Sequence, residues 1–136
     1  MSNKIAVVLG SFHKKEAEIM LQEARKVAKE NSLEITQEVW VPGSMEKPLA
    51  VKRILKSGKV DGIAVLGIIE RGETKHGLVM GHSVISALID LQLEFMKPIG
   101  IGILGPEILP DQIQPRLKPY AKGAVLAVKE MLQQGR

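Results

Sequence analysis

Four short aliphatic runs alternate along this chain with segments of helical periodicity. The runs are KIAVVLG (4–10), LEITQEVWV (33–41), DGIAVLG (61–67) and KPIGIGILG (97–105). Runs that are apolar nearly throughout are typical of strands buried on both faces of a parallel sheet. Strands that alternate with helices over the whole length predict an α/β fold, in which right-handed helical crossovers join parallel strands.

Four segments carry apolar residues at the spacing of an amphipathic helix. We expect helices over 14–31, 46–56 and 77–95, and a last helix from Pro115 or Pro119 to Gln133. The residues predicted to face the core are Ala17, Met20, Leu21, Ala24, Val27 and Ala28; Leu49, Ala50, Ile54 and Leu55; Leu78, His82, Ile85 and Ile89; and Ala124, Val125, Val128, Met131 and Leu132. With 136 residues, the chain suits one domain, 1–136.

Composition narrows the classes of protein that fit. The chain has no cysteine, which excludes disulfides and cysteine-ligated metals and is compatible with a reducing compartment. Its apolar stretches fall short of the roughly 20 residues that span a bilayer. The net charge of +4 comes from scattered lysines and arginines, which favours a small anionic ligand over a nucleic-acid groove. We therefore expect a cytoplasmic protein without nucleic-acid or membrane partners.

Polar residues gather where the predicted strands end. In open parallel sheets, ligands bind in the crevice beyond the carboxyl ends of the strands. The residues at these ends are Ser11, Phe12 and His13; Pro42, Gly43, Ser44, Met45 and Glu46; the stretch GIIERGETKHG (67–77); and Gly105, Pro106 and Glu107. The sequence thus predicts a binding rim at one edge of the sheet.

Within GIIERGETKHG, Gly72 permits a tight turn before the third helix. Glu73, Thr74 and their backbone amides would then lie at a helix N-terminus, where free amides and the helix dipole attract anions. The alternative is that Thr74 only caps the helix. The spacing matches neither a Walker loop nor a dinucleotide glycine fingerprint, which argues against nucleotide hydrolysis and hydride transfer.

Two further residues have alternative interpretations. His76 is either a general acid/base, since histidine titrates near working pH, or a solvated residue. Phe12 either packs on the first helix or lies exposed as a stacking surface for a flat ring. The three histidines lack the spacing of a zinc site, so we predict no metal, and His82 is interpreted as structural.

The motifs VPGSMEKPLA (41–50), LGIIERGETKH (66–76) and the KG pair (122–123) resemble, in this order, the 6,7-dimethyl-8-ribityllumazine synthase family. The Gly105-Pro106 pair and QPRLKPYAKG (114–123) look most like its archaeal-type branch. A paralogous archaeal riboflavin synthase shares the valine-proline-glycine turn, but is not expected to carry the glycine-x-threonine-x-histidine pattern. The resemblance implies a three-layer α/β/α sandwich with a four-stranded parallel sheet of flavodoxin-like order 2-1-3-4.

The resemblance also implies a reaction without metal or organic cofactor. Members of the family condense 5-amino-6-(ribitylamino)uracil with 3,4-dihydroxy-2-butanone 4-phosphate, and release phosphate and water. By position, His76 would move protons, Phe12 would stack on the pyrimidine, and Glu73, Thr74 and Arg116 would bind phosphate. The remaining implied contacts are Ser44, Met45 and Glu46 along the ribityl chain, Ile68, Ile69 and Glu70 at the ring edge, Ile101 as an apolar wall from a neighbouring subunit, and Lys122 near the site.

This sequence departs from the family pattern at several positions. Ser11 and His13 flank Phe12 where the family often has arginine and asparagine, Met45 replaces an aromatic residue, and Glu70 replaces an apolar one. Such changes leave an alternative function, a non-catalytic ribityl-ligand binding or shell-forming protein of the same fold. The resemblance further implies a homo-oligomer, either a pentamer or a sixty-subunit shell of pentamers.

Overall fold

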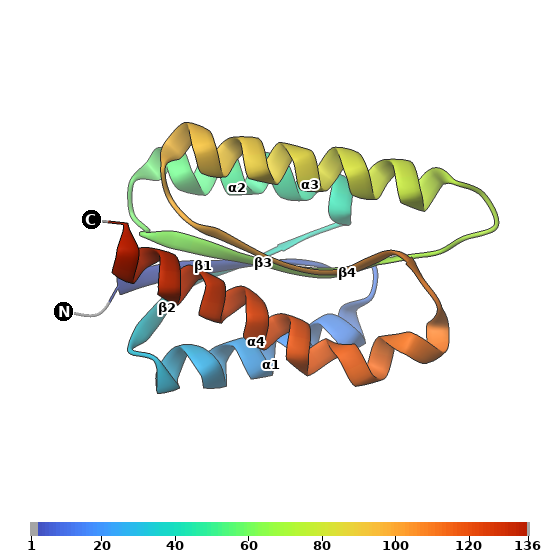
Figure 1. The fold of residues 1–136 in the computed structure, drawn as a ribbon, viewed down its shortest axis with the longest axis horizontal. Coiled ribbons are helices and arrows are strands. Elements are labelled where there is room, and N and C mark those ends of the chain that lie inside the picture. Colours follow the sequence, from blue (N-terminus) through green and yellow to red (C-terminus); the bar gives the residue numbers. More distant parts are fainter. Residues whose placement is uncertain (1–2, 136) are drawn as a thin grey trace.

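Residues 3–135 are described in the computed structural model, which forms three layers (Figure 1). The elements in chain order are β1 (Asn3–Gly10), α1 (Lys14–Glu30), β2 (Leu33–Val41), the short 3-10 helix η1 (Ser44–Glu46), α2 (Lys47–Ser57), β3 (Gly62–Glu70), α3 (His76–Phe95), β4 (Ile99–Ile108) and α4 (Pro110–Gln134). The strands form one parallel sheet in the order β2-β1-β3-β4. The predicted fold class and strand order are therefore confirmed.

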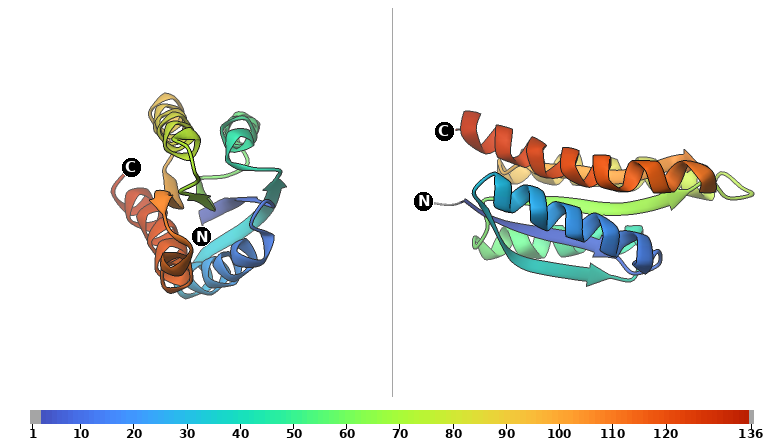
Figure 2. Two further views of the ribbon diagram at one scale, coloured as in Figure 1. Left: turned by 90° about the vertical axis from the view of Figure 1, so that its right-hand side faces the viewer. Right: turned by 90° about the horizontal axis from the view of Figure 1, so that it is seen from below.

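Two apolar cores separate the sheet from its helices. One core joins the sheet to α1 and α4, and the other joins it to α2 and α3 (Figure 2). The central strands β1 and β3 supply side chains to both cores, which explains why their sequences are apolar almost throughout. The edge strand β2 alternates instead, and Arg25 of α1 donates hydrogen bonds of 2.7 and 2.6 Å to Glu38 on it.

The inward face of α1 is the one predicted, whereas that of α3 is not. All six residues expected to be buried on α1 are buried. On α3 the buried residues are Gly77, Gly81, Val84, Leu88 and Leu91, so the predicted face through His82 and Ile89 is wrong. Because apolar residues occur on nearly every side of α3, their spacing in the sequence does not show which side faces the sheet. Leu49 and Met131 were also predicted to face inward and are exposed.

The last helix starts earlier than predicted. The prolines at 115 and 119 suggested a start at one of them, but α4 runs from Pro110 through both, with the KG pair inside it. Ile113, Leu117 and Ala121 are buried at four-residue spacing, and this packing holds the helix together where each proline removes a backbone hydrogen bond. At its start, the Leu109 amide donates to Gln112 Oε1 at 2.9 Å.

The third and fourth strands also extend past their predicted ends. β3 continues through Ile68 and Ile69 to Glu70, which pairs with Ile108 of β4. Gly81 of α3 allows the helix to pack closely on the end of β4, since a Cβ there would lie 2.6 Å from Pro106 Cγ. The residues of GIIERGETKHG are thus divided among the end of β3, an exposed turn and the start of α3.

The length and apolar character of α3 differ from what the sequence led us to expect. At 20 residues it is long and apolar enough to cross a membrane, contrary to the prediction that no stretch approached this length. In this fold it forms a layer of the sandwich, with Val84 and Leu88 packed against the sheet. Much of its apolar outer side stays exposed, including Val79, Ile89 and Leu93.

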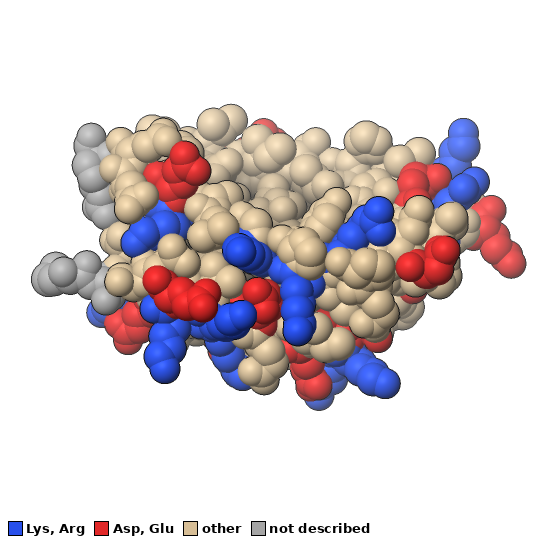
Figure 3. Space-filling view, turned by 60° about the horizontal axis from the view of Figure 1, so that its bottom comes forward, with Lys and Arg blue, Asp and Glu red and all other residues tan. Residues whose placement is uncertain are grey.

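The face formed by α1 and α4 has a different character. Figure 3 shows basic and acidic side chains intermingled over this face. The charges come from residues such as Lys26 and Glu23 on α1 and Lys118 and Asp111 on α4. Neither sign of charge dominates this face.

Candidate functional site

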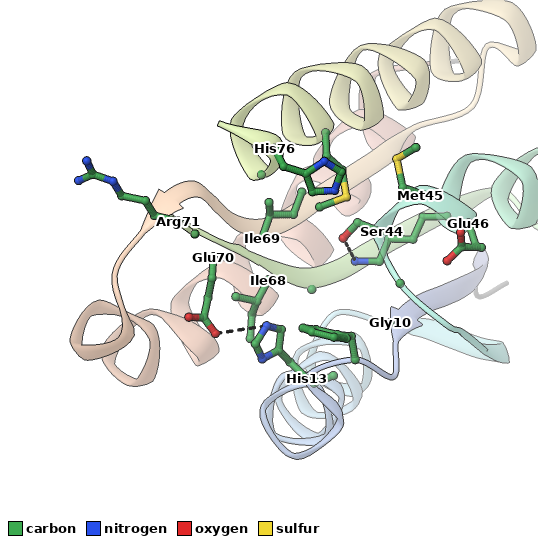
Figure 4. A pocket seen from close by; sticks show the side chains of 18 of the residues that line it. Gly10, His13, Ser44, Met45, Glu46, Ile68, Ile69, Glu70, Arg71 and His76 are labelled. Atoms are coloured by element: carbon green, nitrogen blue, oxygen red, sulfur yellow. Dashed lines mark hydrogen bonds and ion pairs between the residues drawn. The ribbon is translucent and has the colours of Figure 1, made fainter. Parts of the chain in front are cut away.

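A pocket of about 550 Å³ opens at the carboxyl ends of β1 and β3, where η1 and the start of α3 also meet. A cavity of this size matches small-molecule sites. Most of the predicted site residues line it: Phe12, Ser44, Met45, Glu46, Ile68, Ile69, Glu70, Thr74 and His76. Four separate chain segments thus supply the predicted residues to one cavity (Figure 4).

Four predicted residues lie elsewhere. Glu73 is exposed in the turn before α3, next to the lining residue Thr74. Ile101 is half-buried in the middle of β4, and Arg116 and Lys122 are exposed on α4. Arg116 donates a hydrogen bond of 3.0 Å to the Gln112 carbonyl of its own helix. None of the four lines the pocket of its own chain.

We call Phe12, His13, Glu70, Thr74 and His76 the rim of the pocket; three of them are exposed, and His13 and Glu70 are half-buried. At its α3 side, Thr74 Oγ1 accepts a hydrogen bond of 3.2 Å from the His76 amide. Thr74 precedes the N-cap residue of α3, which is Lys75, so the threonine hydroxyl holds the turn before the helix and does not occupy the cap position itself. Other amides of this turn have no carbonyl in a preceding turn to bind, which leaves the helix start suited to an anion. His76 opens α3 and its side chain lies near Met45 (Figure 4).

Phe12 lies on the opposite side of the rim. Its side chain is 83% exposed, so the interpretation that it packs against α1 is wrong. The ring meets His13 edge to face, with centroids 5.0 Å apart and planes at 85°. An exposed aromatic ring at a pocket mouth offers a face on which a flat ligand stacks.

His13 and Glu70, two residues that differ from the family pattern, lie next to each other. His13 Nε2 lies 3.3 Å from Glu70 Oε1, and His13 Nδ1 lies 3.9 Å from Glu16 Oε1 (Figure 4). This contact joins the loop after β1 to the end of β3 across the pocket mouth. The Glu70 carboxylate therefore has an imidazole nitrogen beside it.

We call Gly10, Lys47 and Gly67 the floor of the pocket. Lys47 is the first residue of α2, and its side chain is only 1% exposed. Its Nζ donates a hydrogen bond of 3.3 Å to Ser44 Oγ (Figure 4). Gly67 leaves room for the ammonium, since a Cβ at that position would overlap Lys47 Nζ. Burial lowers the pKa of Lys47 from 10.5 to about 8, because the charged form loses hydration.

Comparison with known proteins identifies the family. The family profile described as 6,7-dimethyl-8-ribityllumazine synthase matches residues 2–136. The chain belongs to this family. A protein of that name from Staphylothermus marinus is 37% identical over 133 residues, which cover 98% of this chain and 89% of the relative.

Two further relatives carry the same name. The lumazine synthase of Metallosphaera sedula is 36% identical over 135 residues, covering 99% of this chain and 89% of the relative. That of Saccharolobus solfataricus is 32% identical over 135 residues, covering 99% and 88%. The resemblance drawn from the three sequence motifs is confirmed over nearly the whole length of this lumazine synthase family member.

Several residues that line the pocket were not among the predicted site residues, and His13 and Lys47 are two of them. His13 was placed at the rim but not among the site residues, and Lys47 was not singled out at all. Lys47 stands between Glu46 and Pro48 at a predicted helix start, a place where a lysine is ordinarily solvated. No pattern in the sequence distinguished it from the other lysines, because its burial depends on Gly10 and Gly67 of two different strands.

Proposed function

We propose that this chain is a 6,7-dimethyl-8-ribityllumazine synthase of riboflavin biosynthesis. It condenses 5-amino-6-(ribitylamino)uracil with 3,4-dihydroxy-2-butanone 4-phosphate and releases phosphate and water. The observation that carries this proposal is the gathering of nine predicted site residues around one pocket in a chain that belongs to the family. A pathway of small soluble metabolites fits a cytoplasmic location.

The pyrimidine binds on the side of the pocket formed by β1, η1 and β3. Phe12 stacks on the ring, and the ends of β3 at Ile68 and Ile69 supply apolar edges. Ser44 and Glu46 bind the ribityl hydroxyls, for which a hydroxyl and a carboxylate are suitable partners. Met45 gives this chain an apolar wall that is more adaptable than an aromatic ring.

The phosphate of the four-carbon substrate binds at the α3 start. Backbone amides around Glu73 and Thr74 face it, and the helix dipole favours its charge. In our proposal, Arg116 and Lys122 approach this site from a neighbouring copy, since neither lines the pocket of its own chain. A guanidinium fork suits phosphate well.

His76 moves protons during imine formation and phosphate loss. A positioned acid/base group contributes about 10²–10⁴-fold, whereas correct orientation of two reactants is worth roughly 7–11 kcal/mol. Most of the catalysis is therefore orientation, and His76 has the smaller share.

We propose a homo-oligomer built from pentamers, either alone or assembled into a sixty-subunit shell. The exposed apolar side of α3, with Val79, Ile89 and Leu93, supports this proposal, because large apolar surfaces commonly mark protein interfaces. Ile101 then forms an apolar wall for the pocket of the adjacent copy. Light scattering of the purified protein measures the assembly size.

A turnover assay tests the activity. The purified protein is incubated with both substrates, and the lumazine is followed by its absorbance and fluorescence. We expect product only when both substrates are present. Binding of the product without turnover would favour the non-catalytic alternative instead.

A variant tests the phosphate assignment. Arg116→Ala should raise the KM for the four-carbon substrate about tenfold or more, with little change for the pyrimidine, because a charge-assisted contact is lost. Lys118→Ala, an exposed cation on the same helix, is the matched control. Equal effects of Arg116→Ala on both KM values would contradict the assignment.

A further inference from the structure

Lys47 is a buried charged residue of the pocket to which the proposed reaction gives no role. Among residues 3–135, no carboxylate forms an ion pair with it. Its ammonium carries three donors, and the hydrogen bond found for the side chain is the one to Ser44 Oγ. A buried cation with so few acceptors is costly and calls for a further partner.

The surroundings of Lys47 show from which side such a partner comes. The aliphatic part of the side chain passes Gly10, where a Cβ would lie 3.5 Å from Lys47 Cε, and the ammonium rests against Gly67. Gly10, Gly67 and Lys47 all line the same cavity. A ligand that fills the cavity therefore reaches the ammonium over bare backbone, with no intervening side chain at these two positions.

The chemistry of the floor favours a neutral oxygen over a phosphate. A phosphate would bring close to two negative charges into a place that is shielded from water and offers a single cation. A ring carbonyl oxygen loses less hydration and still accepts a charge-assisted hydrogen bond. A flat ring also matches a floor bounded by two glycines.

We propose that the Lys47 ammonium binds a ring carbonyl oxygen of the pyrimidine substrate, and retains this contact in the lumazine product. This inference rests on the proposed function, which supplies the heterocycle. Lys47 is thus a ligand-binding residue at the floor, which holds the ring at a fixed depth beneath Phe12.

A pH effect follows from the proposal. A carbonyl partner favours the charged form of the amine, so the bound protein should hold the Lys47 proton at a pH where the free protein has begun to release it. The other charged groups that line the pocket, His13, Glu46, Glu70, Arg71 and His76, are the same with and without Lys47. Binding near pH 8.5 should therefore take up a proton that depends on Lys47.

The test is a fluorescence titration with 6,7-dimethyl-8-ribityllumazine, and a parallel titration with inorganic phosphate. Lys47→Met should bind the lumazine about 10- to 100-fold more weakly, because a hydrogen bond to a charged group is lost. Phosphate affinity should not change. Lys52→Met, an exposed lysine on the same helix, is the matched control and should bind both probes as the wild type does.

Gly67→Ala gives a second route to the same question. A methyl group there displaces the ammonium, so it should weaken lumazine binding in the wild type and have a smaller effect in the Lys47→Met background. Calorimetry in two buffers of different ionisation enthalpy at pH 8.5 should show proton uptake in the wild type and less in Lys47→Met.

The outcomes separate the two proposals. If the wild type fails to bind the lumazine, the proposed function is wrong. If the wild type binds it and Lys47→Met binds it equally well, or if Lys47→Met loses phosphate affinity instead, the assignment of Lys47 is wrong while the proposed function stands. Equal losses from Gly67→Ala in both backgrounds would likewise contradict it.

Discussion

The rim and the floor of the pocket differ in exposure and in what they cost the fold. The rim residues Phe12 and His76 are exposed, so their polarity or ring surface imposes little penalty on folding. At the floor, Lys47 is buried and its charged form opposes folding. Functional side chains at the rim therefore lower the stability of the fold very little. Lys47 at the floor does lower it, which suggests that this residue is kept for a function.

The largest expected effect concerns the stability cost of the floor. The difference between a pKa of 10.5 and one of about 8 corresponds to about 3 kcal/mol. Because the unfolded chain binds this proton more tightly, the free energy of unfolding should rise with pH between 8 and 10.5. Lys47→Met should lack that rise and be more stable than the wild type near pH 7, by about 3 kcal/mol.

Chemical denaturation of both proteins from pH 7 to 11 measures this difference, and groups common to both cancel. If the free energy of unfolding changed with pH in the same way for both proteins, burial of Lys47 would impose no such penalty. The floor and the rim would then not differ in their cost to stability.

At the rim, His76→Ala should lower turnover by about 10²-fold or somewhat less, with substrate binding nearly intact, since a proton shuttle acts in the chemical steps. It should also alter the acid limb of the pH–rate profile. Steady-state kinetics with both substrates measures these effects, and His82→Ala, which changes an exposed histidine further along α3, serves as control. An unchanged turnover would make His76 a binding or scaffold residue.

A smaller effect is expected for the aromatic side of the rim. Phe12→Leu should weaken binding of flat pyrimidine or lumazine ligands by about 1 kcal/mol, because a stacking surface is lost. Thermal stability should stay the same, since the ring is 83% exposed. A clear drop in Tm with unchanged ligand affinity would contradict the stacking role.

The smallest effect is expected for Thr74→Ser. The serine hydroxyl can accept the same hydrogen bond from the His76 amide, and the backbone amides stay in place. Activity and KM for the four-carbon phosphate should match the wild type within twofold. A loss of tenfold or more would show that the threonine methyl group contributes to the site.

The parts of the structure that follow from local pattern could be predicted from sequence. The face of α1 and the alternation of strands and helices agree with prediction, since α1 has one apolar face and clear helical segments separate the strands. The strand order, which also agrees, was implied by the family resemblance and not by local pattern. The buried side of α3 could not be predicted, because apolar residues occur on all sides of this helix and two of its buried residues are glycines. The start of α4 was mispredicted because prolines locally disfavour a helix interior. Burial of Leu117 and Ala121 outweighed that preference.

The candidate site divides in the same way. Its rim could be predicted in large part, because polar residues after an apolar strand stand out and the motifs around Ser44 and Thr74 are specific to the family. The predicted contribution of Gly105, Pro106 and Glu107 was wrong, since these residues of β4 do not line the pocket. The floor could not be predicted, since the position of Lys47 depends on bare backbone at Gly10 and Gly67 from separate strands. Neither strand contains any signal that a lysine of α2 will pack against it.

The helix α3 begins at the pocket with His76 and carries an uncovered apolar side further along, at residues such as Leu93. One helix therefore carries both a wall of the candidate pocket and an apolar surface suited to protein contact. Polar substitutions made on this helix to raise solubility should keep clear of His76 and Gly77, which line the pocket.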